Sequence, residues 1–541
     1  MHDASMAEVD KGHLHGPLSE QQISEAFGDE FWIFSPRFAV YQGEEKKVRP
    51  IDDCKRSGLN TSYTVNFRLE LLDVDALACL IAATNDALAK GAFECELSDG
   101  GLIGCAIHPT VAADEWQGRT LDLSRAYKQL AIDEKSRRLS VVGYQHDNVW
   151  KFYLNHVLPF GATASVYSFN RVSKSLHHIL GKLLFSLSTC FYDDFPTISP
   201  KASASILSKS MTAVLNLLGW DHAQVGVKAI DFASDFNALG ISVNLKQLHR
   251  GSFVLANKAG RVERICGMLK SVMDDGCITK NRASEIQGHL NFAAGFYTSR
   301  ALQFLVASFG RLAEIPKVLV RNDLQLLCEL TIALITSLAP RNFCAGATRN
   351  SLLIFTDGAW ESQKASAGAV VFDPDNGKLS VFEIKVPDAL VDLWLSDTGE
   401  QIISQIEMFA ALCTRCKFSD RLFNRMGIAW IDNESAKYSC IKGTSTSFSM
   451  QALCRVTQQL EIERPSTMWY ERVASHSNPG DLPSRQQVEQ ASALFNATVE
   501  AAWVPPANLV DAIIMLHENP YGVIHALLTG EQTSATNTKR G

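Results

Sequence analysis

Phe191-Tyr192-Asp193-Asp194-Phe195 places two adjacent carboxylates between aromatic side chains, directly behind an apolar run from 183 to 190. The run is short and flanked by turn-forming residues, which predicts a buried strand. Side chains alternate across a strand, so neighbouring aspartates point to opposite faces unless a tight turn separates them. We therefore expect the tip of a β-hairpin. Two carboxylates this close raise each other's pKa, which makes a divalent cation their natural companion.

A third aspartate lies upstream, at the end of another predicted strand. Residues 120–129, Thr-Leu-Asp-Leu-Ser-Arg-Ala-Tyr-Lys-Gln, read as a strand that ends at Asp122 and turns into a short helix. Further along the chain, Pro159 and Gly161 break the backbone before a long helical pattern through positions 169, 172 and 176. The sequence thus orders an aspartate, a Pro-Phe-Gly turn with a helix, and the Asp-Asp hairpin.

This order resembles motifs A, B and C of the reverse transcriptases. The match is specific because three motifs occur in the right order at plausible spacing. It is nearest to retroelement enzymes of the Gypsy-like long-terminal-repeat type or the DIRS type, in which a Pro-Phe-Gly turn is common. The resemblance implies an α+β and α/β multidomain chain with a right-hand polymerase of fingers, palm and thumb. It also implies an RNA-directed DNA polymerase that extends a DNA primer on an RNA template with dNTPs.

The resemblance also assigns roles within the polymerase half. Nucleotide addition is an in-line displacement at phosphorus, which uses two Mg²⁺ ions, with Mn²⁺ as an alternative. By resemblance, Asp122 and Asp193 bridge the metals and Asp194 assists. Tyr127 lies where the family places a steric gate against ribonucleotides, and ordinary core packing is the alternative for it and for Phe160. The expected substrate-binding residues are Arg49, Lys47, Tyr127, Phe160, Gly161 and Tyr192.

The cations among these residues come from a segment that resembles the fingers. Residues 46–53 lead to Gly58-Leu59-Asn60, and a mobile arginine or lysine suits a triphosphate. Arg49 is the first choice and Lys47 the second, with a solvated charged loop as the alternative. The pair Asp52-Asp53 is not assigned to a metal, because the family has a structural acid here. Lys228 is expected to protonate the pyrophosphate leaving group, against the alternative of a surface lysine.

A second set of acids follows in the C-terminal half. The apolar strand 351–355 leads to Asp357-Gly358, a helical pattern carries Glu407, and the strand 427–431 delivers Asp432. Asp481 lies near the start of a last helix, in an Asn-x-x-Asp-x-x-Ser-Arg pattern. These four acids in this order resemble ribonuclease H, which implies two-metal cleavage of the RNA strand of an RNA–DNA hybrid. His476 is a weaker candidate for aiding product release.

Length and charge set the organisation of the chain. At 541 residues it has room for several structural units. The net charge is −7, yet residues 251–321 carry ten lysines and arginines against five acids, which suits either a duplex-binding surface or a mixed-charge solvated face. We expect a linker over residues 341–350. The predicted regions are a partly disordered segment at 1–30, fingers and palm at 31–245, a thumb- or connection-like helical region at 246–345, ribonuclease H at 346–500, and an extension at 501–541 with a disordered tail.

Further patterns narrow the setting. Thirteen scattered cysteines favour free thiols, and Cys413 with Cys416 lacks the second pair that a zinc site needs. Neither a signal peptide nor a membrane span is visible, so we expect an intracellular protein of the cytoplasm or nucleus. No protease, zinc-knuckle, integrase or recombinase segment is recognised. Self-association or a partner encoded by the same element is possible.

Two other functions stay open on the sequence. One is a catalytically idle, retroelement-derived protein that only binds nucleic acid or a partner. The other is a nuclease whose polymerase half is only a scaffold. The presence of all seven acids favours the active enzyme, because a decaying copy loses them at random.

Overall fold

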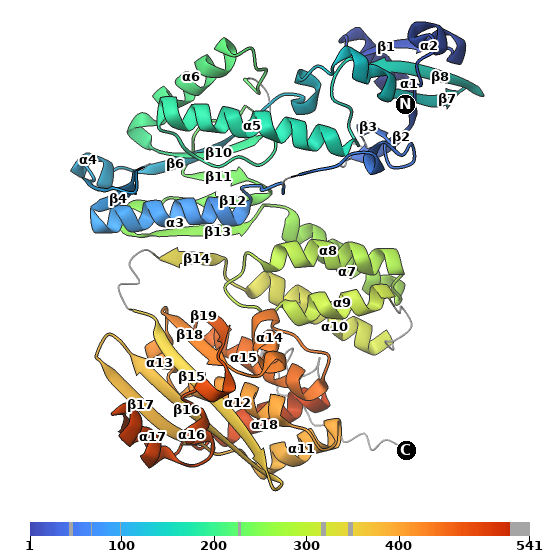
Figure 1. The fold of residues 1–541 in the computed structure, drawn as a ribbon. Helices are drawn as coiled ribbons and strands as arrows, with labels where there is room; N and C mark the ends of the chain where they lie inside the picture. The colour runs from blue at the N-terminus through green and yellow to red at the C-terminus, as the bar shows by residue number, and fades with distance from the viewer. Residues whose placement is uncertain are drawn as a thin grey trace. The chain divides into compact units, whose positions relative to one another are not determined.

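The computed structural model describes residues 1–42, 47–66, 68–97, 99–224, 229–314, 321–344 and 350–519. It divides into two compact units, 1–253 and 254–541 (Figure 1). Both units mix helices with strands, so the predicted mixed α/β multidomain class is confirmed. No helix in the described ranges is both long enough and apolar enough to cross a membrane.

A five-stranded sheet forms the N-terminal part of the first unit. The prediction of a partly disordered segment at 1–30 is wrong, because this segment folds as two helices and an edge strand on that sheet. Met6 and Val9 pack against Leu14 and Tyr153, and Ser19 caps the second helix; neither contact is visible in a polar sequence. The elements are α1 (His2–Asp10), β1 (Leu14–Leu18), α2 (Glu20–Phe27), β2 (Phe34–Gln42), β3 (Lys47–Asp52), β7 (Val141–His146) and β8 (Val149–Asn155), with sheet order β1-β8-β7-β2-β3.

A three-stranded sheet, β6-β10-β9, carries the three predicted catalytic aspartates of this unit. The predicted buried strand at 183–190 is wrong. Helix α5 continues to Leu184, only two residues form β9, and Phe185 is 87% exposed. A short apolar run does not by itself separate the end of a helix from a strand. The elements are β6 (Trp116–Asp122), α5 (Thr163–Leu184), β9 (Leu187–Ser188), β10 (Asp194–Pro200) and α6 (Lys201–Leu217).

The remaining elements of the first unit surround this sheet. Gly118 of β6 leaves room for a neighbouring strand, since a Cβ there would lie 2.2 Å from the ring of Phe236. The described elements are η1 (Leu59–Thr61), α3 (Val74–Lys90), β4 (Ala92–Glu96), β5 (Leu102–Ala106), α4 (Pro109–Ala112), η2 (Ala126–Gln129), η3 (Glu134–Leu139), β11 (Asp235–Ala238), β12 (Ile241–Asn244) and η4 (Leu248–Arg250); β13 (Ser252–Asn257) crosses the boundary between the units.

Four helices open the second unit and share its hydrophobic core. The loop before α9 contacts the region predicted as ribonuclease H directly: the Arg300 backbone N–H donates to Glu461 over 3.1 Å, and its guanidinium donates to the carbonyls of Cys440 and Ile441. The predicted linker at 341–350 begins as a strand, and residues 345–349 lie outside the described ranges. The elements are α7 (Arg261–Asp275), α8 (Lys280–Ala294), α9 (Gln303–Glu314), α10 (Arg321–Ser337) and β14 (Arg341–Cys344).

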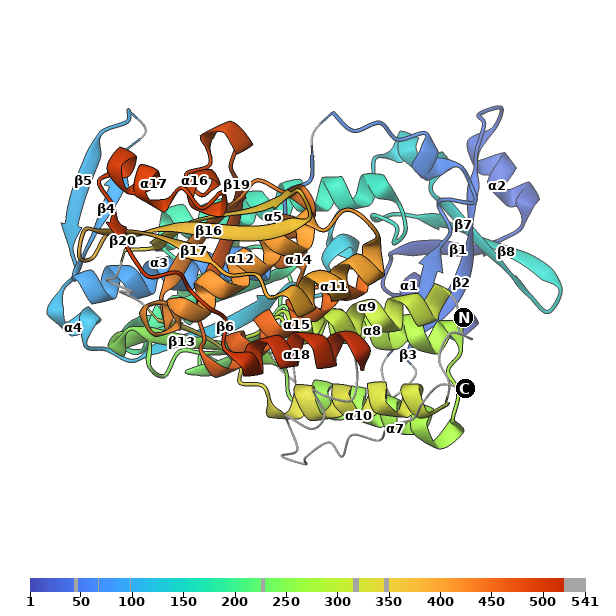
Figure 2. The same cartoon turned by 90° about the horizontal axis from the view of Figure 1, so that it is seen from below.

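A six-stranded mixed sheet with the order β19-β18-β15-β16-β17-β20 carries the second acidic site. Figure 2 shows the same sheet and its helices from below. The elements are β15 (Leu352–Glu361), β16 (Lys364–Asp373), β17 (Lys378–Ile384), α11 (Asp388–Thr398), α12 (Ile403–Lys417), α13 (Ser419–Leu422), β18 (Met426–Ile431), α14 (Glu434–Lys442), α15 (Phe448–Glu463), β19 (Thr467–Arg472), η5 (Ser475–Ser477), α16 (Asp481–Ser484), α17 (Val488–Phe495), β20 (Thr498–Val499) and α18 (Ala507–Glu518).

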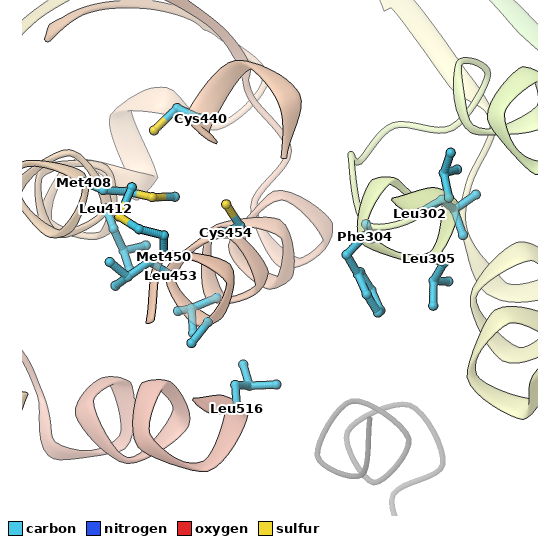
Figure 3. Close-up of a cluster of buried hydrophobic side chains, with 14 of the residues drawn as sticks. Leu302, Phe304, Leu305, Met408, Leu412, Cys440, Met450, Leu453, Cys454 and Leu516 are labelled. Carbon is cyan, nitrogen blue, oxygen red and sulfur yellow. The ribbon is translucent and has the colours of Figure 1, made fainter. Parts of the chain in front are cut away.

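Helices α12, α15 and α18 build the core of this part (Figure 3). The predicted apolar face of α12 is confirmed, since Ile406, Phe409 and Cys413 are fully buried. The predicted C-terminal extension begins inside the same core, because Ile513 and Leu516 of α18 are buried in it. The predicted disordered tail lies within residues 520–541, outside the described ranges.

Candidate active sites

The first acidic site is a hairpin tip beside a neighbouring strand. β10 pairs with β6 in antiparallel register, and Asp194 lies directly opposite Asp122. Asp193 lies in the turn before β10; its carbonyl oxygen accepts from the Leu123 N–H over 3.1 Å. The turn itself is closed by two backbone hydrogen bonds between Phe191 and Asp194, of 2.9 and 3.0 Å. The predicted hairpin tip is therefore confirmed, and it brings all three aspartates to one end of two adjacent strands.

A left-handed backbone residue makes this tight turn. Tyr192 has φ of 52°, a conformation that costs a bulky side chain energy and needs support from its surroundings. The support comes from α5, where the hydroxyl of Ser173 donates to the Tyr192 carbonyl. Helix α5 thereby fixes the hairpin that presents Asp193.

The Pro-Phe-Gly turn is held by Asp52 and Asn60, from the segment that was predicted to form the fingers. Gly161 has φ of +111°, and a Cβ there would lie 2.1 Å from the carbonyl oxygen of Asp52. The Asp52 N–H donates to the Phe160 carbonyl over 3.2 Å. Asn60 completes the clamp, because its amide donates to the Gly161 carbonyl over 2.9 Å and accepts from the Thr163 N–H over 2.8 Å. The sequence contains Gly58-Leu59-Asn60, but its pattern did not reveal this role of Asn60.

Tyr127 lies between this turn and the aspartates. Its ring contacts Phe160 edge-on at 5.2 Å and Phe169 at 4.7 Å between ring centres. Burial, together with Tyr192 and Asp193 nearby, raises the pKa of Tyr127 to about 12, so the phenol stays protonated. Tyr127 thus both packs in the core and adjoins the acidic hairpin, which leaves its predicted gate role a proposal.

Of the three predicted nucleotide-binding cations, the structure describes the side chain of Arg49 alone. Arg49 is exposed on β3, opposite Val40 of β2. The side chain of Lys47 and the whole of Lys228 lie outside the described residues. Asp52 is a buried structural acid, as the family resemblance implied, because it accepts from Arg37 over 2.7 and 3.3 Å.

The second acidic site is a buried group of three carboxylates. Asp357, Glu407 and Asp432 each place a ligand oxygen within 4.8 Å of the others, and they form the one such group of three among the described residues. The three aspartates of the first site do not form such a group in the described part of the chain. Asp432 lies directly after β18 as predicted, whereas β15 continues past Asp357 to Glu361 because it stays paired with β16.

Two glycines allow this approach from both faces of the sheet. A Cβ at Gly358 would lie 2.7 Å from Ile406 and 3.0 Å from the backbone nitrogen of Glu407, so α12 covers that face. A Cβ at Gly368, the register partner of Asp357, would lie 2.3 Å from the Ser484 nitrogen, so α16 covers the other face. The close contact at position 358 is what allows Glu407 to join Asp357.

The electrostatics of this group favour cation binding. Burial and the neighbouring acids raise the pKa of Asp357 to about 6 and that of Glu407 to about 10. The Ser484 hydroxyl opposes this at Asp357, to which it donates over 2.6 Å, and the Asn433 N–H donates to Glu407 over 3.1 Å. Asp432 Oδ1 is buried without a hydrogen-bond partner in the described part of the chain. Three oxygen donors, one of them unsatisfied, fit a hard divalent cation.

The fourth predicted ligand stays outside the group. Asp481 begins α16 as predicted, but its carboxylate accepts from Arg485 over 2.8 Å, and Arg485 also pairs with Glu361. Asp481 is still close enough to raise the pKa of Asp357. His476 is exposed and lines an open pocket together with Asp481 and Arg485. Ser484 and Arg485 belong to the Asn-x-x-Asp-x-x-Ser-Arg pattern, but the pattern does not predict their contacts with Asp357 and Glu361.

Solved structures resemble this chain, whereas the family models and the curated proteins do not match it. No family model matches the chain, and no curated protein matches it. Among solved structures, the chain is similar to the foamy viral protease-reverse transcriptase dRH in complex with double-stranded DNA. The likeness has a TM-score of 0.44 at 12% identity and covers 86% of this chain and 68% of that one.

Proposed function

We propose that this protein is a retroelement RNA-directed DNA polymerase that also cleaves the RNA strand of RNA–DNA hybrids. The observation that carries the proposal is the register of β6 and β10, which sets Asp122 opposite Asp194 with Asp193 in the adjoining turn. The second carboxylate group supports the nuclease part of it. The motif resemblance supplies the reaction class, because neither acidic site alone selects a substrate.

In the polymerase half, Asp122, Asp193 and Asp194 would hold divalent cations, and the clamped turn would shape the base-pair pocket. Phe160 and Gly161 are fixed through Asp52 and Asn60, so the incoming base meets a rigid surface. Tyr127 packs against Phe160 and lies where a ribose 2′-hydroxyl would collide with a ring. Arg49, Lys47 and Lys228 are proposed to bind the triphosphate and to protonate pyrophosphate, and Tyr192 to contact the primer end.

In the nuclease half, Asp357, Glu407 and Asp432 would hold the cations and orient a water at the scissile phosphate. Bound Mg²⁺ or Mn²⁺ would supply Lewis-acid chemistry there, by lowering the pKa of the attacking water and neutralising developing charge. Glu407 must lose its proton when a cation binds, because its pKa of about 10 keeps it neutral otherwise. Asp481 is proposed to join this site when its ion pair with Arg485 opens. The RNA template, DNA primer and hybrid would lie along the basic span at 251–321.

The test is primer extension on poly(rA)·oligo(dT) with dTTP and Mg²⁺, with the RNA labelled so that cleavage is measured in the same tube. Asp193→Asn with Asp194→Asn should abolish extension and spare cleavage, whereas Asp432→Asn should do the reverse. Asp29→Asn, an exposed acid outside both sites, is the matched control. Extension that survives the double substitution contradicts the polymerase assignment.

The idle nucleic-acid-binding protein is the alternative function, and the basic span favours it equally. It predicts hybrid binding without extension or cleavage in Mg²⁺ or Mn²⁺. Cleavage without extension in the wild-type protein would instead support the nuclease with a scaffold polymerase half.

A further inference from the structure

We propose that Glu8, on the N-terminal helix α1, is a positioning residue for the nucleotide site and acts through Lys128 and Arg37 on the Phe160-Gly161 turn. The proposal rests on the polymerase function proposed above. Glu8 does not belong to any of the sequence motifs, and the segment that carries it was expected to be partly disordered.

Glu8 places one carboxylate between two buried cations. Its Oε2 lies 2.9 Å from Arg37 Nη1 and its Oε1 lies 3.4 Å from Lys128 Nζ. The side chains of Arg37 and Lys128 are 1% and 5% exposed, so neither cation is solvated by bulk water. Burial alone would raise the pKa of Glu8, but the two cations hold it below its usual value. Glu8 is therefore charged at neutral pH and compensates both cations.

One route from Glu8 leads through Arg37. The Arg37 guanidinium donates to both carboxylate oxygens of Asp52, over 2.7 and 3.3 Å, and to the buried Ser5 hydroxyl of α1. The backbone of Asp52 is the surface against which the turn folds, through its N–H to the Phe160 carbonyl and its carbonyl beside Gly161. A shift of Arg37 thus moves the backbone that holds the turn.

The other route leads through Lys128. Lys128 directly follows Tyr127, and its ammonium lies 5.5 Å from the centre of the Phe160 ring. The same ring contacts Tyr127 edge-on. Burial lowers the pKa of Lys128, and Glu8 is the charge that most offsets this. Both routes from Glu8 therefore end at Phe160, once through its backbone and once through its ring.

Loss of the Glu8 charge should disturb the Phe160-Gly161 turn, although Glu8 itself is not proposed to contact the substrate. Arg37 would keep its pair with Asp52, but Lys128 would lose the carboxylate that lies beside its ammonium and would be repelled by Arg37. A buried charge left without its partner moves or draws in water. Small displacements at a binding surface cost up to about 100-fold in rate. We expect nucleotide binding to suffer more than the chemical step, because the aspartates belong to β6 and the β10 hairpin, on neither route.

The experiment compares Glu8→Gln with Asp10→Asn, an exposed acid on the same helix. Extension of poly(rA)·oligo(dT) is measured against dTTP concentration. We expect the KM for dTTP to rise about tenfold or more in Glu8→Gln, within the range for small misplacements, with a much smaller change in kcat, and no change in Asp10→Asn. If Glu8→Gln unfolds, Glu8→Asp keeps the charge and should raise KM less.

Two further measurements separate positioning from general damage. Adding Glu8→Gln to Lys128→Met should raise the KM less than Glu8→Gln does in the wild type, because only the route through Arg37 is left to disturb. Acylation of Lys128 by an amine-reactive reagent, read by mass spectrometry, should increase in Glu8→Gln in the absence of any substrate. Unchanged KM and unchanged acylation would overturn the proposal while a wild type that extends primers keeps the polymerase function. A wild type that extends no primer would refute the function, and the Glu8 proposal with it.

Discussion

Removal of the Ser484 hydroxyl should shift the pH dependence of RNA cleavage upward. Ser484 is fully buried and its Oγ lies 2.6 Å from Asp357 Oδ2, against 2.8 Å to the Asp481 carbonyl, so its single hydrogen favours the charged carboxylate. This hydrogen bond stabilises the ionised form of Asp357, whose pKa is nevertheless raised to about 6 by burial and by Asp432 and Asp481. Ser484→Ala therefore makes Asp357 harder to ionise.

The size of the shift follows from the strength of a hydrogen bond to a charged group. Such bonds contribute about 1.5–3 kcal/mol, and about 1.36 kcal/mol corresponds to one pKa unit. We expect the acidic limb of the cleavage profile to move up by about 1–2 pH units. Activity at pH 6 should fall about 5- to 50-fold, because the ionised fraction of Asp357 falls from about one half to between about a tenth and a hundredth, while activity at high pH recovers.

The assay is single-turnover cleavage of a labelled hybrid between pH 5 and 9 at fixed Mg²⁺. Ser477→Ala, at an exposed serine of the neighbouring η5, is the matched control and should leave the profile in place. Calorimetric titration with Mn²⁺ gives a readout that needs no substrate, and its affinity at pH 6 should fall in parallel. A uniform loss of cleavage at every pH would refute the reasoning, since it would show that Ser484 only packs.

Three further predictions address the other contacts. Tyr127→Val should admit ribonucleotides during extension, because it removes the ring that packs against Phe160, and unchanged discrimination would place the gate elsewhere. Gly161→Ala should reduce extension by at least about 100-fold, since its Cβ would overlap the Asp52 carbonyl at 2.1 Å and small misplacements already cost that much; hybrid cleavage serves as the internal control. Without a cation, the wild-type protein should lose stability as pH rises above about 5, by up to about 1.4 kcal/mol per unit, because the native state retains the Glu407 proton that the unfolded chain releases. Urea titrations at pH 5 to 8 should show that the free energy of unfolding falls less steeply with pH in Glu407→Gln than in the wild type. The urea midpoint of Glu407→Gln should no longer rise with Mg²⁺.

The sequence predicted the position of those acids that follow a strand or begin a helix. Asp122, Asp432 and Asp481 each occupy the strand end or helix start that their neighbours predicted. The hairpin at Asp193 followed from the alternation of side chains along a strand. These features depend on a few adjacent residues, so periodicity and turn signals suffice to place them.

The sequence was silent or misleading where partners are distant. The bond from Asn60 to Gly161 spans 101 positions and that from Ser484 to Asp357 spans 127, so no local pattern contains either. The N-terminal helix looked too polar to order, yet its few apolar residues and Glu8 find partners on the sheet. The run at 183–190 was predicted to be a buried strand, but its apolar residues Leu183, Phe185 and Leu187 lie at the surface.

The long-range contacts that no local pattern contains bear on whether the chain is an active enzyme or an idle relic. A decaying copy loses supporting residues as readily as it loses acids, since selection protects neither. Here the supports are in place: Asn60 clamps the turn, Ser484 holds Asp357, and Gly358 leaves room for Glu407. None of these contacts is needed by a protein that only binds nucleic acid, and a buried carboxylate group with raised pKa values is a cost to such a protein. These contacts and the buried carboxylate group therefore favour the proposed catalytic function over the idle relic.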